Sequence, residues 1–237
     1  SNFIEKCYKK SIISIDCETN SLAAKTAVLV GLSLSYDAGK ACYIPLRHGF
    51  DFIKDQSDFL ADNKGTFEQI PFDEVIEKIK PILEDESILK IGHNIKYDAL
   101  VLTQKYNGSI DLYPIGDTMC LSYVVDPGRV VNHKLDNLAS RELDYETIKY
   151  EDVCGKGKNQ IKFNQLTPVE ALNYAAEDAD VTLALYNNLL PRVISDRKLT
   201  VYKRLENPLI NVLMDMENIG VLVNPKKLID ISSNLSI

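Results

Sequence analysis

The segment SIISIDCE, residues 11–18, guides the interpretation of the rest of the sequence. Its first part, Ser11–Asp16, is a short β-branched apolar run, which is typical of a buried strand. Two carboxylates, Asp16 and Glu18, stand two positions apart at the end of this run. In an extended segment this spacing places both side chains on one face. We therefore expect a buried strand that ends in two acids pointing the same way.

The segments that follow predict a sheet with helices around it. The turn signal Asp37-Ala38-Gly39 separates two further apolar runs, Ala27–Ser35 and Ala41–Leu46, so an antiparallel meander is expected. Residues 47–71 are polar and irregular, which indicates a long surface loop. The other expected elements are a strand at Ile88–Ile91 and helices at Phe72–Asp85 (kinked or restarted at Pro81), Lys96–Tyr106, Asp117–Val125, Lys134–Glu142, Pro168 to about Leu190, and Leu199–Asn218.

This order of elements indicates an α/β fold, a mixed β-sheet flanked by α-helices. The start of the long helix is the clearest boundary, because Thr167 can cap it, Pro168 suits its first position, and Glu170 can complete a capping box. We expect two parts, a domain over residues 1–198 and a truncated helical segment over 199–237. The second part is too short to form a domain alone.

Composition narrows the possible functions. Hydrophobic residues make up 45% of the 237 residues and charged residues 26%, as in ordinary globular proteins. The longest apolar runs, such as Ala27–Leu32, are too short to span a bilayer, so no membrane partner is expected. Five cysteines without a Cys-x-x-Cys spacing argue against a disulfide framework or a zinc ribbon and fit a cytoplasmic location.

The net charge of −7 speaks against extensive non-specific binding of duplex DNA, which needs clustered Lys and Arg. It remains compatible with a small site that holds a few nucleotides. Bound metal cations can supply there the positive charge that the side chains lack.

Two other places combine acids with special positions. Asp98 closes the segment GHNIKYD, residues 92–98, at an expected strand-to-helix junction, where α/β sheets commonly bind ligands. Tyr174 and Asp178 are four apart and so share one helix face. Each feature alone has an ordinary explanation: a turn or cap residue for Asp16, a first-turn acid for Asp98, and a surface pair for Tyr174 and Asp178.

Together these residues predict a metal site. Four converging carboxylates would repel one another, and Mg²⁺ or Mn²⁺ ions would neutralise them. Two ions roughly 3.5–4 Å apart can clamp the attacking and leaving oxygens of a phosphodiester. We expect Tyr174 to orient the attacking water, because an unperturbed phenol titrates near pH ~10 and is a poor base at neutral pH.

The same residues resemble the proofreading 3′–5′ exonuclease domain of bacterial family A DNA polymerase I, a member of the DnaQ-like (DEDD-Y) superfamily. The resemblance covers nearly the whole chain, since the segment from Glu206 to Pro225 is similar to the start of the polymerase region. It is carried by Ile15–Leu22 (IDCETNSL), Lys90–Asp98 (KIGHNIKYD), Gly155–Gln160 (GKGKNQ), Phe163–Gln165 (FNQ) and Tyr174–Leu183 (YAAEDADVTL).

The resemblance implies a ribonuclease-H-like fold and two divalent ions, Mg²⁺ or Mn²⁺, with Zn²⁺ an alternative at one site. Asp16, Glu18 and Asp178 would hold the first ion. Asp16 would also serve the second, which Asp98 would reach through a bound water. Tyr174 would help to place the nucleophile.

The resemblance also implies contacts with the substrate, a single-stranded or frayed DNA 3′ end. Leu22 would wedge against the terminal bases, with ordinary packing as its alternative role. Asn94 would touch the strand backbone, and Thr19 and Tyr97 complete the expected contacts. Tyr150 would stack on a base, with a half-buried structural aromatic as its alternative role.

Some positions depart from the family pattern. Cys17 replaces the usual Thr between the two carboxylates and should face away from the metals. His93 stands where Gln is common. The Arg expected before His133 is absent; Asn132 is there, with Arg129 nearby. These departures concern contacts with the strand backbone more than the chemistry.

The leading hypothesis is therefore a 3′–5′ exonuclease that trims DNA 3′ ends, attached to a polymerase domain. We expect a monomer in the bacterial cytoplasm, associated with the nucleoid. A ribonuclease D-like RNA exonuclease would share the three motifs but would not explain the segments between Lys156 and Gln165. The non-enzyme alternative is a catalytically weak scaffold domain that only binds nucleic acid.

Overall fold

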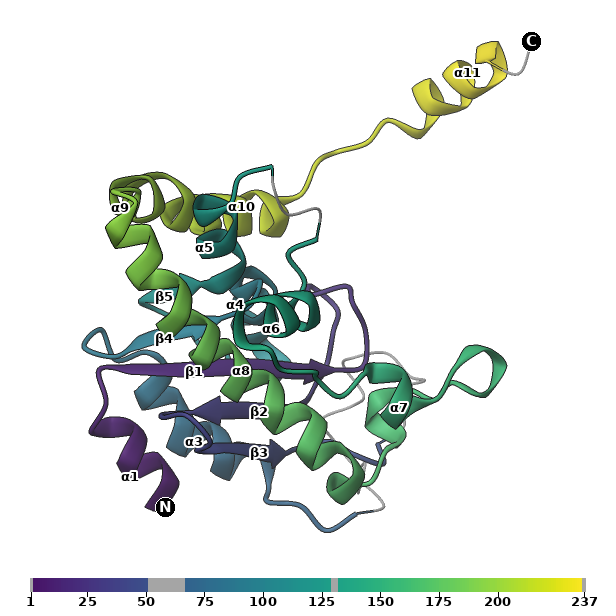
Figure 1. Cartoon of the computed structure of the whole chain (residues 1–237). Coiled ribbons are helices and arrows are strands. Elements are labelled where there is room, and N and C mark those ends of the chain that lie inside the picture. The colour runs from purple at the N-terminus through teal and green to yellow at the C-terminus, as the bar shows by residue number, and fades with distance from the viewer. Residues whose placement is uncertain (1, 51–66, 129–131, 236–237) are drawn as a thin grey trace.

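The computed structural model describes residues 2–50, 67–128 and 132–235, and Figure 1 shows a central sheet with helices on both faces. Most of the expected loop over residues 47–71, namely residues 51–66, lies outside the described residues. Arg129 lies outside them as well. The strands are β1 (Ile12–Thr19), β2 (Leu29–Ser35), β3 (Ala41–Pro45), β4 (Leu89–Gly92) and β5 (Ile115–Asp117). The longer helices are α1 (Asn2–Tyr8), α3 (Phe72–Leu83), α4 (Ile95–Thr103), α5 (Thr118–Val125), α6 (Leu135–Leu143), α7 (Tyr150–Cys154), α8 (Pro168–Ser195), α10 (Asn207–Ile219) and α11 (Pro225–Leu235).

The sheet has the strand order β3-β2-β1-β4-β5 and is mixed. β1 pairs antiparallel with β2 and parallel with β4, while the β2–β3 pair is antiparallel and the β4–β5 pair parallel. The expected α/β class and the antiparallel meander are therefore confirmed. β1 lies in the middle, so its side chains are covered on both faces.

Alternation along β1 separates the two layers. Ile13, Ile15 and Cys17 belong to the main core, together with buried side chains of α3 and α4. The residues between them face α8. The strand runs to Thr19, three residues beyond the expected end, so both acids lie inside it, and a register shift against β2 falls between Glu18 and Thr19. The strand continues past Asp16 because backbone pairing with β2 continues.

Helix α8 lies very close to the sheet. Its inward face carries Ala171, Ala175 and Ala179, which are fully buried. The hydroxyl of Ser14 on β1 donates to the carbonyl oxygen of Ala179 over 2.6 Å. Because only alanines on the helix and a serine on the strand lie between the two backbones, α8 can approach β1 closely. These small side chains therefore set the distance between α8 and β1.

The expected start of α8 is confirmed, but its expected end is wrong. The Thr167 hydroxyl accepts from the Glu170 amide, and the Glu170 carboxylate accepts from the Thr167 amide. The helix runs past Pro191 to Ser195 instead of stopping at Leu190. Fully buried Val193 holds the last turn in the core, so packing outweighs the hydrogen bond that proline removes.

Several short elements were not expected from the sequence. These are α1, β5, α7 and α11, each short or lacking a clear periodic pattern. The expected helix at Lys96–Tyr106 ends at Thr103 and is followed by a 3₁₀ turn at Lys105–Asn107. The expected helix at Leu199–Asn218 is divided into α9 (Leu199–Val201), a π-helical turn at Tyr202–Glu206 and α10.

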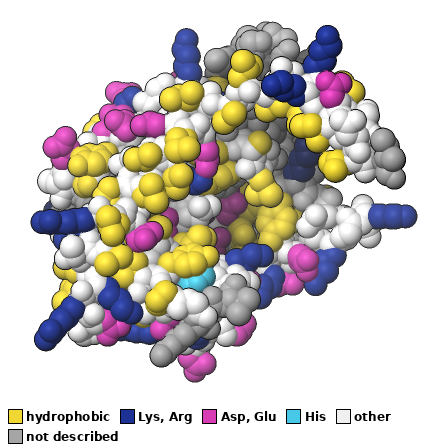
Figure 2. Space-filling view, turned by 90° about the horizontal axis from the view of Figure 1, so that it is seen from above, with side chains coloured by type: hydrophobic (Ala, Val, Ile, Leu, Met, Phe, Trp, Pro, Cys, Tyr) yellow, Lys and Arg dark blue, Asp and Glu magenta, His cyan; other side chains and the backbone are white. Residues whose placement is uncertain are grey.

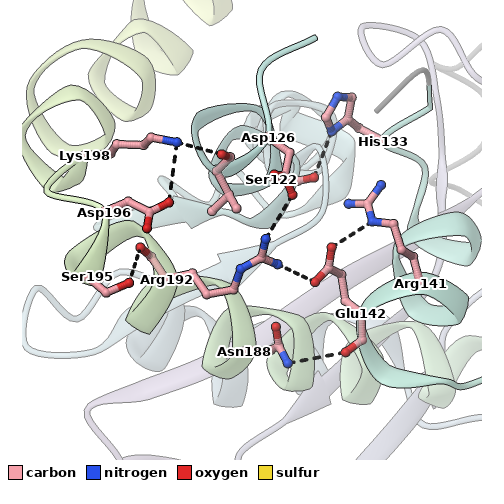
Figure 3. Close-up of polar contacts among 11 residues, drawn as sticks. Ser122, Asp126, His133, Arg141, Glu142, Asn188, Arg192, Ser195, Asp196 and Lys198 are labelled. Atoms are coloured by element: carbon pink, nitrogen blue, oxygen red, sulfur yellow. Dashed lines mark hydrogen bonds and ion pairs between the residues drawn. The ribbon is translucent and has the colours of Figure 1, made fainter. Parts of the chain in front are cut away.

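A charged network ties α5, α6 and α8 together (Figure 3). The Arg192 guanidinium on α8 donates to Glu142 over 2.5 Å and to Asp126 over 3.0 Å. Arg141 also pairs with Glu142, and the Ser122 hydroxyl lies 2.8 Å from Nδ1 of His133. The Arg192 guanidinium thus joins α8 to Glu142 on α6 and to Asp126 at the end of α5.

Residues 199–219 pack on the rest of the chain, whereas α11 stands away from it (Figure 1). The Tyr202 hydroxyl accepts from the Asp117 amide over 3.0 Å, and the Asn207 side-chain amide donates to the Ile115 carbonyl over 2.9 Å. Ile210 joins the main core. The division into residues 1–198 and 199–237 stays a prediction.

Asn107 offers a test of the fold. Its fully buried side chain accepts from the Leu29 amide and donates to the carbonyls of Ala27 and Val101, so it joins β2 to the end of α4. Asn107→Ala removes these hydrogen bonds, leaves the Leu29 amide and the Ala27 carbonyl without their side-chain partner, and should lower the free energy of unfolding by about 2–4 kcal/mol. Urea denaturation measures this loss. Exposed Asn159→Ala is the control, and an equal effect of both variants would contradict the assignment.

Candidate active site

Three carboxylates converge at the carboxyl end of β1. Asp16 and Glu18 come from β1, and Asp178 comes from α8 where that helix crosses the strand. Each offers a carboxylate oxygen, and these oxygens all lie within 4.8 Å of one another. Close contact between α8 and β1 thus brings together residues that are 160 positions apart in the chain.

Asp98 approaches the same strand from α4. Its side chain is buried, and its Oδ1 accepts the amide of Cys17 over 2.9 Å, which places it beside the backbone between Asp16 and Glu18. It does not belong to the group of three oxygens within 4.8 Å. The sequence-based expectation treated all four acids as ligands; the structure groups three closely and sets Asp98 next to them.

The start of α4 is fixed by local backbone chemistry. Asn94 adopts a left-handed conformation with φ 62°, which Asn tolerates better than most residues. The Ile95 amide in the first turn donates to the Asp117 carboxylate over 2.7 Å, and the same carboxylate accepts the Cys120 amide at the start of α5. Asp117 therefore anchors two helix starts, a role that its sequence context did not reveal.

The four acids destabilise one another's charges. Burial raises the pKa of Asp16 to about 6. Burial first, and then the charge of Asp16, raise the pKa of Glu18, Asp98 and Asp178 well above their usual values. Among the described residues, no Lys or Arg side chain forms an ion pair with any of the four.

This donor set fits divalent cations. Carboxylate oxygens are the ligands that Mg²⁺ and Mn²⁺ prefer, and within the described parts of the chain these acids form no ion pair with Lys or Arg. A bound ion would favour the charged forms that burial and mutual repulsion disfavour. The geometry therefore fits a metal centre built on Asp16, Glu18 and Asp178, with Asp98 at its side.

Two adjoining cavities form a groove over the acids. One, of about 480 Å³, includes Glu18 and Leu22 in its lining, and the other, of about 210 Å³, includes Asp178. Tyr150 and Tyr174 line both cavities. The space-filling view shows a hollow with acidic side chains at its floor and hydrophobic and basic side chains around it (Figure 2).

Tyr174 stands one helical turn before Asp178. Burial first, and then the charges of Asp178 and Glu18, raise the pKa of its hydroxyl far above the usual value. Its ring lies edge-on to the Tyr150 ring, with the centroids 6.2 Å apart, and next to the Phe163 ring at 5.8 Å. The Tyr174 phenol is thus held in place and stays protonated at neutral pH.

Three of the other expected contact residues, Thr19, Leu22 and Tyr97, line one wall of the groove. The hydroxyls of Thr19 and Tyr97 lie 2.5 Å apart, and each also lies within hydrogen-bond distance of the Ser21 carbonyl oxygen, at 2.9 Å and 2.6 Å respectively. This bonding fixes the turn that presents Leu22, whose side chain is 95% exposed. Such exposure argues against ordinary packing for Leu22. Asn94 lies beyond this wall at the start of α4 and does not line either cavity.

Two departures from the family pattern have clear positions. Cys17 is buried in the main core, as a side chain that faces away from the three clustered oxygens would be, but its thiol hydrogen-bonds to the carboxylate of Asp98. His93 Nδ1 lies 2.8 Å from the Thr118 hydroxyl, and burial lowers its pKa to about 4. A neutral, buried His93 at this site contacts neighbouring protein groups instead of the groove.

The groove also contains residues that sequence reasoning did not single out. Gln160 and Lys162 line the larger cavity, and Asp136, Thr147 and Lys149 line the smaller one. Gln160 lies in a stretch that resembles the family. The other four residues are of types that are common on protein surfaces, so the sequence alone does not mark them as part of a site. Only the folded arrangement brings them to the groove.

Comparison with known proteins supports the chemistry of this site. A family model described as 3′–5′ exonuclease matches residues 1–194. A DNA polymerase I from Rhizobium leguminosarum is 39% identical over 234 residues, covering 95% of this chain and 22% of the relative. The chain thus spans about a fifth of the length of that polymerase.

Solved structures support the fold. The Pol1 structure from M. smegmatis in complex with DNA primer-template and dNTP matches with a TM-score of 0.70 at 20% identity, covering 99% of this chain and 33% of that one. Escherichia coli RNase D, an exoribonuclease, matches with a TM-score of 0.61 at 18% identity, covering 93% and 48%. The expected ribonuclease-H-like fold is confirmed. No described helix is both long and apolar enough to cross a membrane.

The raised pKa of Asp16 predicts how stability depends on pH. The folded-state pKa of about 6 lies above the ordinary aspartate value of 3.8, so the stability that Asp16 contributes is fully present below pH 3.8 and is lost as the pH rises through 6. Between pH 4 and 8, the unfolding free energy of the metal-free wild type should therefore fall by up to about 3 kcal/mol more than that of Asp16→Asn.

Denaturation at several pH values in EDTA measures this difference. Added Mn²⁺ at pH 8 should restore stability to the wild type more than to Asp16→Asn, because the ion favours the charged acids. A difference between the two proteins that does not change with pH would contradict the raised pKa of the buried Asp16 carboxyl.

Proposed function

This chain belongs to the 3′–5′ exonuclease family of A-type DNA polymerases, and we propose that it removes nucleotides one at a time from DNA 3′ ends as the proofreading domain of a DNA polymerase I. The observation that carries the proposal is the convergence of Asp16, Glu18 and Asp178 on one point, with Asp98 bound to the backbone beside them. Clustered acids that form no ion pair with a described Lys or Arg are best explained by a metal-dependent reaction on a phosphodiester.

The acids would hold two divalent ions, Mg²⁺ or Mn²⁺ with Zn²⁺ an alternative at one site. When bound, such ions supply charge neutralisation and acidify a water molecule. Asp16, Glu18 and Asp178 would bind the first ion, and Asp16 and Asp98 the second. The side chains thus provide a fixed frame of oxygens, set by one strand and two helices.

Tyr174 would position the attacking water. Its raised pKa keeps the hydroxyl protonated, so it can donate or accept a hydrogen bond but does not act as a base at neutral pH. Its ring is held between Tyr150 and Phe163, which limits the places that the hydroxyl can reach.

The terminal nucleotides would lie in the groove. Leu22 would wedge against the last bases, Tyr150 would stack on a base, and Thr19, Asn94 and Tyr97 would contact the strand. The groove is small and the net charge is −7, so a single-stranded or frayed end should be preferred to a paired end.

Residues 199–237 would form the beginning of the polymerase region. Figure 2 looks onto α10 from above and shows many exposed hydrophobic side chains on this face. Those of α10 and α11 are Leu209, Val212, Leu213, Met216, Ile219, Leu228, Ile229, Ile231 and Leu235. An apolar surface of this extent favours a covering partner, and the polymerase domain of the longer relatives is the proposed one. The protein would act as a monomer in the bacterial cytoplasm, near the nucleoid.

The first test compares single-stranded DNA and RNA of the same sequence, labelled at the 5′ end, with Mg²⁺ or Mn²⁺. DNA should be trimmed from its 3′ end faster than RNA and faster than blunt duplex DNA, and EDTA should stop the reaction. Faster trimming of RNA would favour a ribonuclease D-like enzyme. Failure to cleave either substrate with either metal would favour a scaffold domain.

Asp98→Asn tests the role of this acid in the same assay. The variant keeps an oxygen that can accept from the Cys17 amide but loses the charge. The rate should fall by at least about 10³-fold, since charge stabilisation worth several kcal/mol is lost, while thermal stability is unchanged or increased. Asp180→Asn makes the same chemical change outside the site and should keep the normal rate. A near-normal rate in Asp98→Asn would refute the assignment.

Tyr174→Phe tests positioning by the hydroxyl. The ring and its aromatic contacts remain, so stability should not change, whereas kcat should fall about 10–10³-fold. The alkaline side of the pH–rate profile should keep its shape, because the Tyr174 hydroxyl does not titrate there. A loss as complete as that of Asp98→Asn would mean that Tyr174 does more than orient water.

A further inference from the structure

Glu177 directly precedes Asp178 on α8, but its carboxylate points to a different part of the chain. One oxygen, Oε1, accepts the Tyr145 hydroxyl over 2.6 Å. The other, Oε2, accepts the backbone amide of Ile148 over 2.7 Å. Both oxygens are therefore used to hold a single segment, residues 144–149, which joins α6 to α7.

This segment has no helix or strand of its own. Among the described residues, the hydrogen bonds that join it to α8 both end on Glu177. Its other hydrogen bonds lead to α6, through the Tyr145 amide on Ala139 and the Ser140 hydroxyl on Glu146, and to α7, through Lys149 and Asp152. Its position over α8 consequently depends on the Glu177 carboxylate.

The segment forms a wall of the groove. Thr147, Ile148 and Lys149 line the smaller cavity together with Asp178 and Tyr174. Tyr150 follows this segment directly as the first residue of α7, and it lines both cavities. Its ring lies edge-on to that of Tyr174, with the ring centroids 6.2 Å apart. A shift of the segment would therefore widen the groove between Tyr150 and Asp178.

We propose that Glu177 is a positioning residue for substrate. It holds the segment of residues 144–149 against α8, so that this segment and the adjoining Tyr150 meet the terminal nucleotides. This inference rests on the proposed exonuclease function, because it assigns the groove to a nucleic-acid end. Glu177 acts through the segment and does not itself touch the carboxylate cluster. Its loss should weaken substrate binding more than the chemical step.

Asp180, three positions further along α8, provides a matched control. Its Oδ1 accepts the Gly39 amide over 2.8 Å and the Ser35 hydroxyl over 3.3 Å, so it too holds a turn with two hydrogen bonds. That turn joins β2 to β3, away from the groove. Asp180→Ala should thus lower stability as Glu177→Ala does, without changing how substrate binds.

The experiment measures KM and kcat on single-stranded DNA for Glu177→Ala, Glu177→Gln, Tyr145→Phe and Asp180→Ala. Glu177→Ala should raise KM about tenfold, which corresponds to about 1.4 kcal/mol, with kcat within about threefold of the wild type. Glu177→Gln should restore most of the affinity, since an amide can still accept from Ile148 and donate to the Tyr145 oxygen. Tyr145→Phe should raise KM about two- to threefold, because one hydrogen bond remains.

Hydrogen exchange provides a second measurement that does not need activity. In the metal-free wild type, the Ile148 amide should be protected, and exchange over residues 145–150 should rise in Glu177→Ala but not in Asp180→Ala. If the wild type lacked exonuclease activity, the proposed function would fail, whereas exchange and binding of a labelled oligonucleotide in EDTA would still test this inference.

Equal KM values in Glu177→Ala and Asp180→Ala would overturn the proposal, as would unchanged exchange over residues 145–150. A large loss of kcat with unchanged KM would also overturn it, because it would assign Glu177 to the carboxylate cluster. If Glu177→Ala did not fold, Tyr145→Phe would decide, and an unchanged KM together with unchanged exchange would refute the role of the segment.

Discussion

The close approach of α8 to β1 is the constraint on which the site depends. The Ser14 hydroxyl reaches the Ala179 carbonyl over 2.6 Å, and this distance is possible only because small residues face each other across the layer. Asp178 and Asp16 neighbour these two residues in sequence. Their carboxylates can meet because the backbones that carry them are already close. A larger side chain at Ala175 or Ala179 would separate the layers and the acids together.

The same approach creates an electrostatic cost. Carboxylates that are buried side by side raise one another's pKa, and the described part of the chain offers them no ion-pair partner. Such strain is characteristic of functional sites, where groups are placed for a ligand and not for stability. The surrounding core offsets it, since Ile13, Ile15 and Cys17 on the opposite face of β1 are packed among buried aliphatic side chains.

Sequence patterns predicted the parts of this protein that local chemistry specifies. The capping signal of Thr167 and Glu170, the turn after Asp37 and the alternation along β1 all act over a few residues, and the structure bears them out. Asp98 could be selected from its junction, but not its bond to the Cys17 amide, which joins residues 81 positions apart. The continuation of α8 beyond Pro191 depends on tertiary packing of Val193, which no local rule describes. The groove residues Thr147 and Lys149 were missed for the same reason.

The acids of α8 show why a charge pattern alone could not identify the site. Glu177, Asp178 and Asp180 lie within four consecutive positions, and by composition they resemble a solvated helix face. In the folded chain Glu177 holds the segment before α7, Asp178 meets the carboxylates of β1, and Asp180 holds the turn between β2 and β3. Successive residues of a helix point about 100° apart, so neighbouring acids reach different elements. One turn of α8 therefore carries three acids that contact the wall of the groove, the carboxylate cluster and the turn between β2 and β3. The element that lies opposite each carboxylate determines what that carboxylate does.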